Sequence, residues 1–147
     1  MKINSFVKPL LFSILFFFVC NQLFAQSNFI KINISALNTD KGNVLVALFN
    51  APNGFPEDAS KAYKTAKSKA VKGTKSIILT DIPPGIYAIA IFHDANDDGK
   101  MNKNMLGIPK EGYGVSNNVK NLMSAPEFKA AKFTHQQSTE LSIVINY

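Results

Sequence analysis

The sequence predicts an all-β fold, namely an antiparallel β-sandwich of the immunoglobulin or transthyretin-like type with one short helix and a long ordered loop. Apolar and polar side chains alternate over several short segments, and clusters of Gly, Pro, Asn and Asp separate these segments. Strand-like and helix-like segments do not follow each other regularly, as they would in a parallel sheet with helical crossovers. We expect six or seven strands.

The N-terminus is predicted to be a secretory signal peptide over residues 1–25. Lys2 and Lys8 precede an apolar run at residues 9–20, and the small residue Ala25 follows. This run is shorter than the ~20 apolar residues that a membrane-spanning helix needs. We therefore expect export to the periplasm or the exterior, and a mature chain that is one β-sandwich domain, residues 26–147, without a transmembrane segment. Cys20 would leave with the leader, so no disulfide is expected.

The charge pattern excludes one class of partner. All 16 basic residues are lysines, against 10 acidic residues, and two of the lysines belong to the predicted leader. Nucleic-acid sites depend on the bidentate contacts of arginine, which this chain does not contain. We expect a lysine-coated surface and no nucleic acid. The partner expected instead is an envelope or extracellular ligand, which the sequence does not identify.

The first strands are expected at residues 29–37 and 43–50. The first segment places three isoleucines on one face and polar residues on the other, and the second is apolar on both faces, as in an interior strand. The turn-forming sequence NTDKG separates them, so residues 30–49 are predicted to form a hairpin. Residues 56–70 begin with Pro-Glu-Asp, which is typical of a helix start, and continue with spaced alanines. A short helix is expected there.

The second half of the chain predicts four more strands. Residues 77–79 and 86–92 are separated by Pro-Pro-Gly, which favours a second hairpin. The segment 86–92 is apolar on both faces, so it is expected to be central. Residues 127–135 and 138–147 are predicted to be two further strands, joined by a short turn.

The stretch HDANDDGKMNKNMLGIPKEGYGVSNN, residues 93–118, is predicted to be a long loop with the oxygen pattern of a calcium site. Alternate residues carry oxygen ligands and a glycine permits the sharp turn. The candidate ligands are Asp94, Asn96, Asp98, Lys100 through its backbone carbonyl, and Asn102. Asp and Asn also cap their own backbone turns without any metal. The sequence leaves open whether the loop binds Ca²⁺ or caps itself.

His93 opens this loop beside Asp94, and the later Glu111 could fold back onto it. A histidine next to two carboxylates is the composition of an acid–base cluster. The other interpretation is that the His93 ring hydrogen-bonds backbone carbonyls and pins the loop to the sheet. Ser116 lies outside any nucleophile-elbow pattern.

The segment DIPPGIYAIAIFHDANDDGKMNKNMLGIPKEGYGVSNN resembles the signature of an exported bacterial family, domain of unknown function 2141. The resemblance extends over nearly the whole predicted mature chain and includes APEFKAAKF and Tyr147. It implies a β-sandwich module without an established activity. The chain departs from the family pattern at Ala95, where Glu is common, at Asn102, where Asp is common, and at Val115, where Phe is common. The first two changes remove carboxylates from the predicted calcium loop.

Two functions remain open from the sequence. In the first, the chain is an exported, non-enzymatic module whose 93–118 loop is a rigid binding or interaction surface, stabilised by Ca²⁺ if the oxygens bind it. In the second, it is an envelope-associated hydrolase that uses His93, Asp94 and Glu111 as acid–base groups. A hydrolase requires a pocket beside an exposed His93, whereas the binding module requires a buried His93 and a loop that closes on itself.

Overall fold

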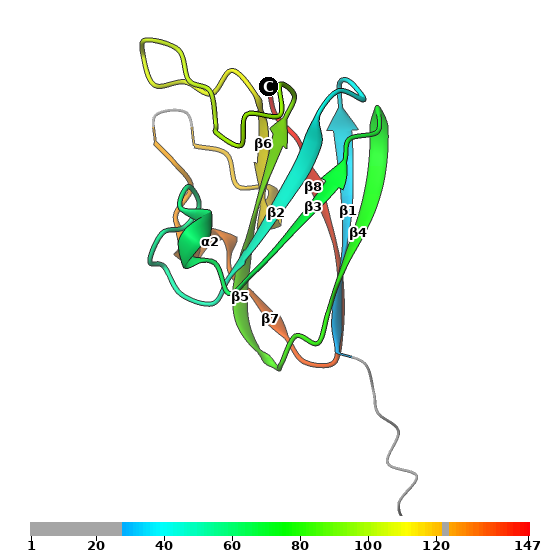
Figure 1. Ribbon diagram of the computed structural model, residues 1–147. Coiled ribbons are helices and arrows are strands. Elements are labelled where there is room, and N and C mark those ends of the chain that lie inside the picture. The colour runs from blue at the N-terminus through cyan, green and yellow to red at the C-terminus, as the bar shows by residue number, and fades with distance from the viewer. Residues whose placement is uncertain (1–27, 122–123) are drawn as a thin grey trace, which may run out of the picture.

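The computed structural model describes residues 28–121 and 124–147, which form two β-sheets packed face to face (Figure 1). The three-stranded sheet has the order β4-β1-β8, with β1 at Phe29–Leu37, β4 at Gly73–Thr80 and β8 at Ser138–Val144. The five-stranded sheet follows the path β3-β2-β5-β6, and β7 also pairs with β5. Its strands are β2 (Asn43–Phe49), β3 (Lys64–Lys69), β5 (Gly85–Asp94), β6 (Gly112–Val115) and β7 (Phe133–His135). The predicted all-β sandwich is confirmed.

Helical structure among the described residues is confined to short turns. These are the 3-10 turns η1 (Ala59–Lys61) and η2 (Ser116–Asn118) and the single α-helical turn α2 (Phe128–Ala131). In this part of the chain no helix has the length and apolarity that crossing a membrane requires. The predicted leader, residues 1–25, lies outside the described residues.

The main core lies between the two sheets. Successive side chains of a strand point to opposite faces, so β1 buries Ile30, Ile32 and Ile34 while its polar residues stay partly exposed. Opposite them, the five-stranded sheet contributes its own apolar stripe. The largest fully buried side chains facing this core include Val44, Val46, Leu48, Ile82, Ile89 and Ile143.

A second apolar cluster covers the outer face of the five-stranded sheet. Ala88 and Ala90 of β5 leave room there for Phe55 and for Phe128 of α2. The Phe55 ring meets the rings of Phe49 and Phe128 edge to face, with centroids 5.4 and 5.8 Å apart. Strand β5 is thus buried on both faces, which confirms the prediction that it is central.

The two predicted hairpins are wrong, although their strands exist. β1 pairs with β4 and β8, whereas β2 pairs with β3 and β5. The turn at residues 38–42 therefore carries the chain from one sheet to the other, and residues 81–84 do the same between β4 and β5. The reason is that both strands of each predicted hairpin, β1 with β2 and β4 with β5, carry an apolar stripe on one face. These stripes bury more surface by facing each other across the core than by lying side by side in one sheet.

The predicted helix over residues 56–70 is also wrong. Only η1 is helical there, and Lys64–Lys69 form the edge strand β3. Along β3, Lys64, Ala66 and Ser68 are half-buried while the residues between them are exposed. The alanines fit both a helical and a strand period, and pairing with β2 decides the outcome. The exposed lysines suit an edge strand because they discourage pairing with another chain.

The C-terminal segment differs from prediction in three ways. Residues 128–131 form α2, so β7 is only three residues long. β7 and β8 belong to different pairings, because β7 joins β5 and β8 joins β1. The β1–β8 pair is parallel, so the sandwich is not antiparallel throughout. Before this segment, the predicted loop at 93–118 ends in β6 and η2, which leaves residues 95–111 as the irregular part.

Candidate functional site

The segment between β5 and β6, residues 95–111, projects from one end of the sandwich (yellow-green in Figure 1). We call it the finger. Its base is the end of β5, where His93 and Asp94 lie, together with Glu111 just before β6. Every candidate residue from the sequence lies in the finger or in this base.

His93 is fully buried, and both of its ring nitrogens are engaged. Nε2 lies 2.9 Å from the Lys41 carbonyl, which accepts, so this nitrogen carries the proton. Nδ1 lies 2.6 Å from the Tyr147 hydroxyl, which donates to it and in turn accepts the Asn38 N–H at 3.1 Å. The ring thus bonds one backbone carbonyl, as the structural interpretation expected, but it ties β5 to the 38–42 turn and the C-terminus and does not pin the loop to the sheet.

Asp94 is fully buried and caps the first turn of the finger. Its Oδ1 accepts the N–H of Asp98 at 3.1 Å and its Oδ2 accepts the N–H of Gly99 at 2.9 Å. The backbone of Asp94 is itself in close contact with the 38–42 turn. A Cβ at Gly42, which has φ +67°, would lie only 1.9 Å from the Asp94 carbonyl oxygen. Only glycine fits there.

Glu111 folds back across the finger as the sequence suggested. Its carboxylate is buried, with Oε1 accepting the N–H of Ala95 at 3.1 Å. Oε2 accepts both the backbone N–H and the side-chain Nδ2 of Asn102, at 2.9 and 3.2 Å. One carboxylate therefore joins the two ends of the first half of the finger.

The exposed oxygens of the finger also accept hydrogen bonds from within it. Asp98 accepts the Lys100 N–H through Oδ1 at 2.8 Å, and the side-chain amides of Asn96 and Asn102 through Oδ2, both at 3.0 Å. These donors, with the Asn102 amide foremost, lower the pKa of Asp98. The side chains that sequence analysis proposed as calcium ligands are thus brought together.

Their arrangement is that of a self-capped loop. Within the described part of the chain, no group of three or more His, Cys, Asp or Glu side chains is placed to hold a metal ion. The oxygens of Asp94 and Asp98 accept N–H groups, and Asn102 turns its nitrogen toward Asp98. A calcium ion needs six to eight oxygens directed at one point, which these contacts do not provide. Calcium binding stays a prediction.

Asp97 is a residue of the finger that sequence reasoning missed. Its Oδ1 accepts from the buried Asn43 side chain at 2.5 Å and from the Lys67 ammonium at 2.8 Å. The Lys67 hydrogen bond is the main cause of a lowered pKa at Asp97, and reciprocally raises the pKa of Lys67. Asp97 thereby fastens the finger to β2 and β3. Asp97 has a positive φ of +60°, a backbone conformation that the sequence does not reveal.

The far end of the finger is a tight turn with exposed apolar side chains. Lys103 and Pro109 pair across it as an isolated antiparallel bridge. Beyond this bridge lie residues 104–108, which we call the tip. The exposed fractions of its apolar side chains are 104% for Met105, 83% for Leu106 and 55% for Ile108.

The polar run after β6 serves the fold. Ser116 Oγ is buried, donates to the Ala131 carbonyl at 2.6 Å and accepts the Ile89 N–H at 2.9 Å. Asn117 donates to the Ala130 carbonyl in α2 and to the Lys132 carbonyl just after it. Asn118 donates to the Ser142 carbonyl of β8 and accepts the N–H of Val144. These three side chains hold β5, α2 and β8 together, because each satisfies main-chain groups outside the regular ladders.

The glycines before them permit a close approach of the two sheets. A Cβ at Gly112 would lie 2.5 Å from Ile145 Cγ2 and 2.6 Å from a Tyr147 ring carbon. Tyr113 and Asn146 exchange backbone hydrogen bonds of 2.9 and 2.8 Å, which close the sandwich on this side. The base of the finger is thus held by both sheets.

A match to a known family covers most of this architecture. The family described as "Uncharacterized protein conserved in bacteria (DUF2141)" matches residues 32–142, from β1 to β8. The chain belongs to the DUF2141 family. No curated protein and no solved structure matches it. The resemblance noted from sequence is confirmed, and in this DUF2141 member the signature residues His93, Asp94 and Ser116 to Asn118 are buried or bonded to the backbone.

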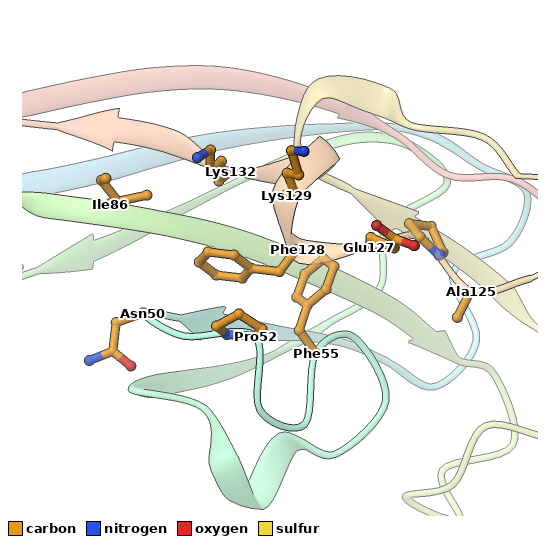
Figure 2. A pocket seen from close by; sticks show the side chains of 10 residues that line it. Asn50, Pro52, Phe55, Ile86, Ala125, Glu127, Phe128, Lys129 and Lys132 are labelled. Carbon is orange, nitrogen blue, oxygen red and sulfur yellow. The ribbon is translucent and has the colours of Figure 1, made fainter.

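An open groove of about 710 Å³ lies elsewhere, on the outer face of the five-stranded sheet (Figure 2). Figure 2 shows the rings of Phe55 and Phe128 side by side in it, with Lys129 and Lys132 at its rim. Its other lining residues are Asn50, Pro52, Ile86, Ala125, Pro126 and Glu127. No residue of the finger or its base contributes to this groove.

Proposed function

We propose that this DUF2141 chain is an exported, non-enzymatic binding module, and that the segment 93–118 presents a rigid surface to an envelope or extracellular ligand. One observation carries the proposal. The carboxylates of Asp94 and Glu111 hold the shape of the finger by accepting its N–H groups, while the tip of the finger is left exposed. What the finger offers to its surroundings is a fixed shape.

The contacts of the base argue against the hydrolase alternative. A general base must reach a substrate proton within hydrogen-bond distance. The two nitrogens of His93 are occupied by Lys41 and Tyr147, and the imidazole has no exposed surface. Asp94 and Glu111 are buried too, and each oxygen of both carboxylates accepts at least one N–H.

Export is proposed on the order of the N-terminal sequence alone. A Ca²⁺ ion is not required to explain the order of the finger, because hydrogen bonds already satisfy its carboxylates. If calcium binds, it does so after the loop oxygens exchange these partners for the ion. The proposal of a rigid surface does not depend on it.

The test is photo-crosslinking in intact cells that export the protein. A photoreactive amino acid replaces Leu106 at the tip or, as a control, Ile78 on β4, which is also exposed. We expect adducts with an envelope component, lipid or protein, from position 106 and few from position 78. Equal yields at the two positions would contradict a dedicated binding surface at the finger.

A further inference from the structure

The tip combines an apolar surface with a convex shape. Met105, Leu106 and Ile108 are among the most exposed large apolar side chains of the described residues. Three such side chains on one five-residue turn are different from singly scattered surface residues, which need no explanation. Because they end a projecting segment (Figure 1), they can enter another medium without the sandwich moving closer.

Most N–H groups of the tip backbone are satisfied from within the tip. The Asn104 N–H donates to the Ile108 carbonyl at 2.8 Å, and the Gly107 N–H donates to the Asn104 carbonyl at 2.9 Å. The Asn104 side-chain oxygen accepts the N–H groups of Leu106 and Ile108, at 2.9 and 3.0 Å. Entry into a medium poor in water is costly mainly for unpaired backbone groups. Four N–H groups of the tip avoid that cost.

Lysines flank the tip on both sides. Lys100 and Lys103 precede it and Lys110 follows it, and all three are exposed. Lys103 also pairs with Glu57 at 2.8 Å. The acidic groups of the finger and its base, Asp94, Asp97, Asp98 and Glu111, accept hydrogen bonds behind this point. The tip thus presents apolar side chains at its end and lysine ammonium groups just behind them, an arrangement complementary to an anionic lipid surface.

We propose that the tip inserts Met105, Leu106 and Ile108 into the interface of an anionic lipid bilayer, while the flanking lysines contact the phosphate groups. This inference rests on the proposed binding function and names its partner. A protein that adds a strand would need free N–H groups at the tip, and most of these are engaged. Lipid headgroups, by contrast, accommodate a convex apolar turn with a closed backbone.

The experiment measures binding of the full chain, as recovered from an exporting host, to vesicles of phosphatidylcholine with and without phosphatidylglycerol. All variants share the same N-terminus, so any effect of that segment cancels. We expect flotation with the anionic vesicles, weakening with salt. Met105→Ser with Leu106→Ser should lower the partition coefficient by about tenfold for each side chain. The matched control, Val71→Ser with Ile78→Ser, also removes two exposed apolar side chains and should bind as wild type.

The charge and the depth of insertion are tested separately. Lys100→Gln with Lys110→Gln should reduce binding by about fivefold for each lysine, and Lys61→Gln with Lys72→Gln should do so much less. Because the chain contains no tryptophan, Leu106→Trp provides a single fluorophore whose emission should shift to shorter wavelength with anionic vesicles. Ile78→Trp should show no shift.

The outcomes separate this inference from the function on which it rests. Vesicle binding that is absent, or that survives the tip substitutions, overturns the lipid inference. If position 106 then crosslinks to protein in cells, the binding surface stands with a different partner. If wild type sediments as a dimer and the tip variant as a monomer, the occupant is a second copy of the chain. If position 106 crosslinks no better than position 78, both proposals fail.

Discussion

Replacing Glu111 by Gln tests whether the finger is one cooperative unit. The substitution keeps the shape of the side chain but exchanges one acceptor oxygen for an NH₂ group and removes the charge. In the structure the two oxygens accept three N–H groups, one from Ala95 and two from Asn102. The Gln amide would keep its oxygen on Asn102 and would therefore place its NH₂ group against the Ala95 N–H. Two donors would then face each other.

The expected cost follows from these contacts. Losing a hydrogen bond to a charged group costs about 1.5–3 kcal/mol. The two bonds to Asn102 persist, but bonds to a neutral oxygen are about half as strong as those to a carboxylate. We therefore expect the finger to lose about 3 kcal/mol of stability against local opening, which corresponds to a rise of about a hundredfold in the open population.

Native-state amide hydrogen exchange reads this opening directly. The informative amide is that of Gly99, whose N–H donates to the Asp94 carboxylate and not to Glu111. If the finger opens as a unit, exchange at Gly99 accelerates together with exchange at Ala95 and Asn102, while core amides of β2 and β5 change little. Glu127→Gln, at an exposed position, is the matched control and should leave all these rates unchanged. Acceleration at Ala95 alone would refute the reasoning, since the carboxylate would then hold one contact rather than the whole shape.

Three further predictions concern the finger and its base. His93→Ala should lower the free energy of unfolding by about 1–3 kcal/mol, because the Lys41 carbonyl and the Tyr147 hydroxyl lose the buried ring as a partner. A change below about 0.5 kcal/mol in denaturant melts would contradict this structural role of His93. The depressed pKa values of Asp97 and Asp98 mean that the stability they contribute is present above the unfolded pKa near 3.8 and is lost as pH falls through the folded value. The protection of the finger amides, measured relative to their intrinsic exchange rates at each pH, should therefore fall below about pH 4, and should fall less in Asp97→Asn. A calcium site of about 1 mM affinity predicts a rise in Tm of about 3–7 °C at 10 mM Ca²⁺ that is lost in Asp98→Ala. If Ca²⁺ shifts the Tm of neither the wild type nor this variant, the finger does not bind calcium at this affinity.

Alternation along the chain predicts the strands of this fold but not their partners. The three isoleucines of β1 and the two apolar faces of β5 are visible in the sequence, and both strands form as expected. The turns at 38–42 and 81–84 contain the residues of an ordinary hairpin turn, and the same residues serve a crossing between sheets. What decides between the two is the burial of facing stripes, which depends on strands far apart in sequence.

In the candidate site, too, the sequence predicts the local contacts but not those between distant segments. The side chains Asp94, Asn96, Asp98 and Asn102 come together as their spacing predicts, since this grouping is local. The contacts of His93 with Tyr147 and of Asp97 with Lys67 join segments 54 and 30 residues apart. No periodicity or motif signals such pairs, and they decide whether the base is reactive or structural.

The base and the tip of the finger depend on different interactions. Met105 and Leu106 are nearly fully exposed, so their substitution should alter stability by less than about 0.5 kcal/mol. The fold therefore does not require apolar residues at these positions, and the solubility of the chain would gain from polar ones. The base, in contrast, is fixed by buried hydrogen bonds and by glycines at which a Cβ would collide with the backbone or with core side chains. Substitutions at the tip can thus alter what the finger contacts, while the hydrogen bonds and glycines of the base maintain the shape of the finger.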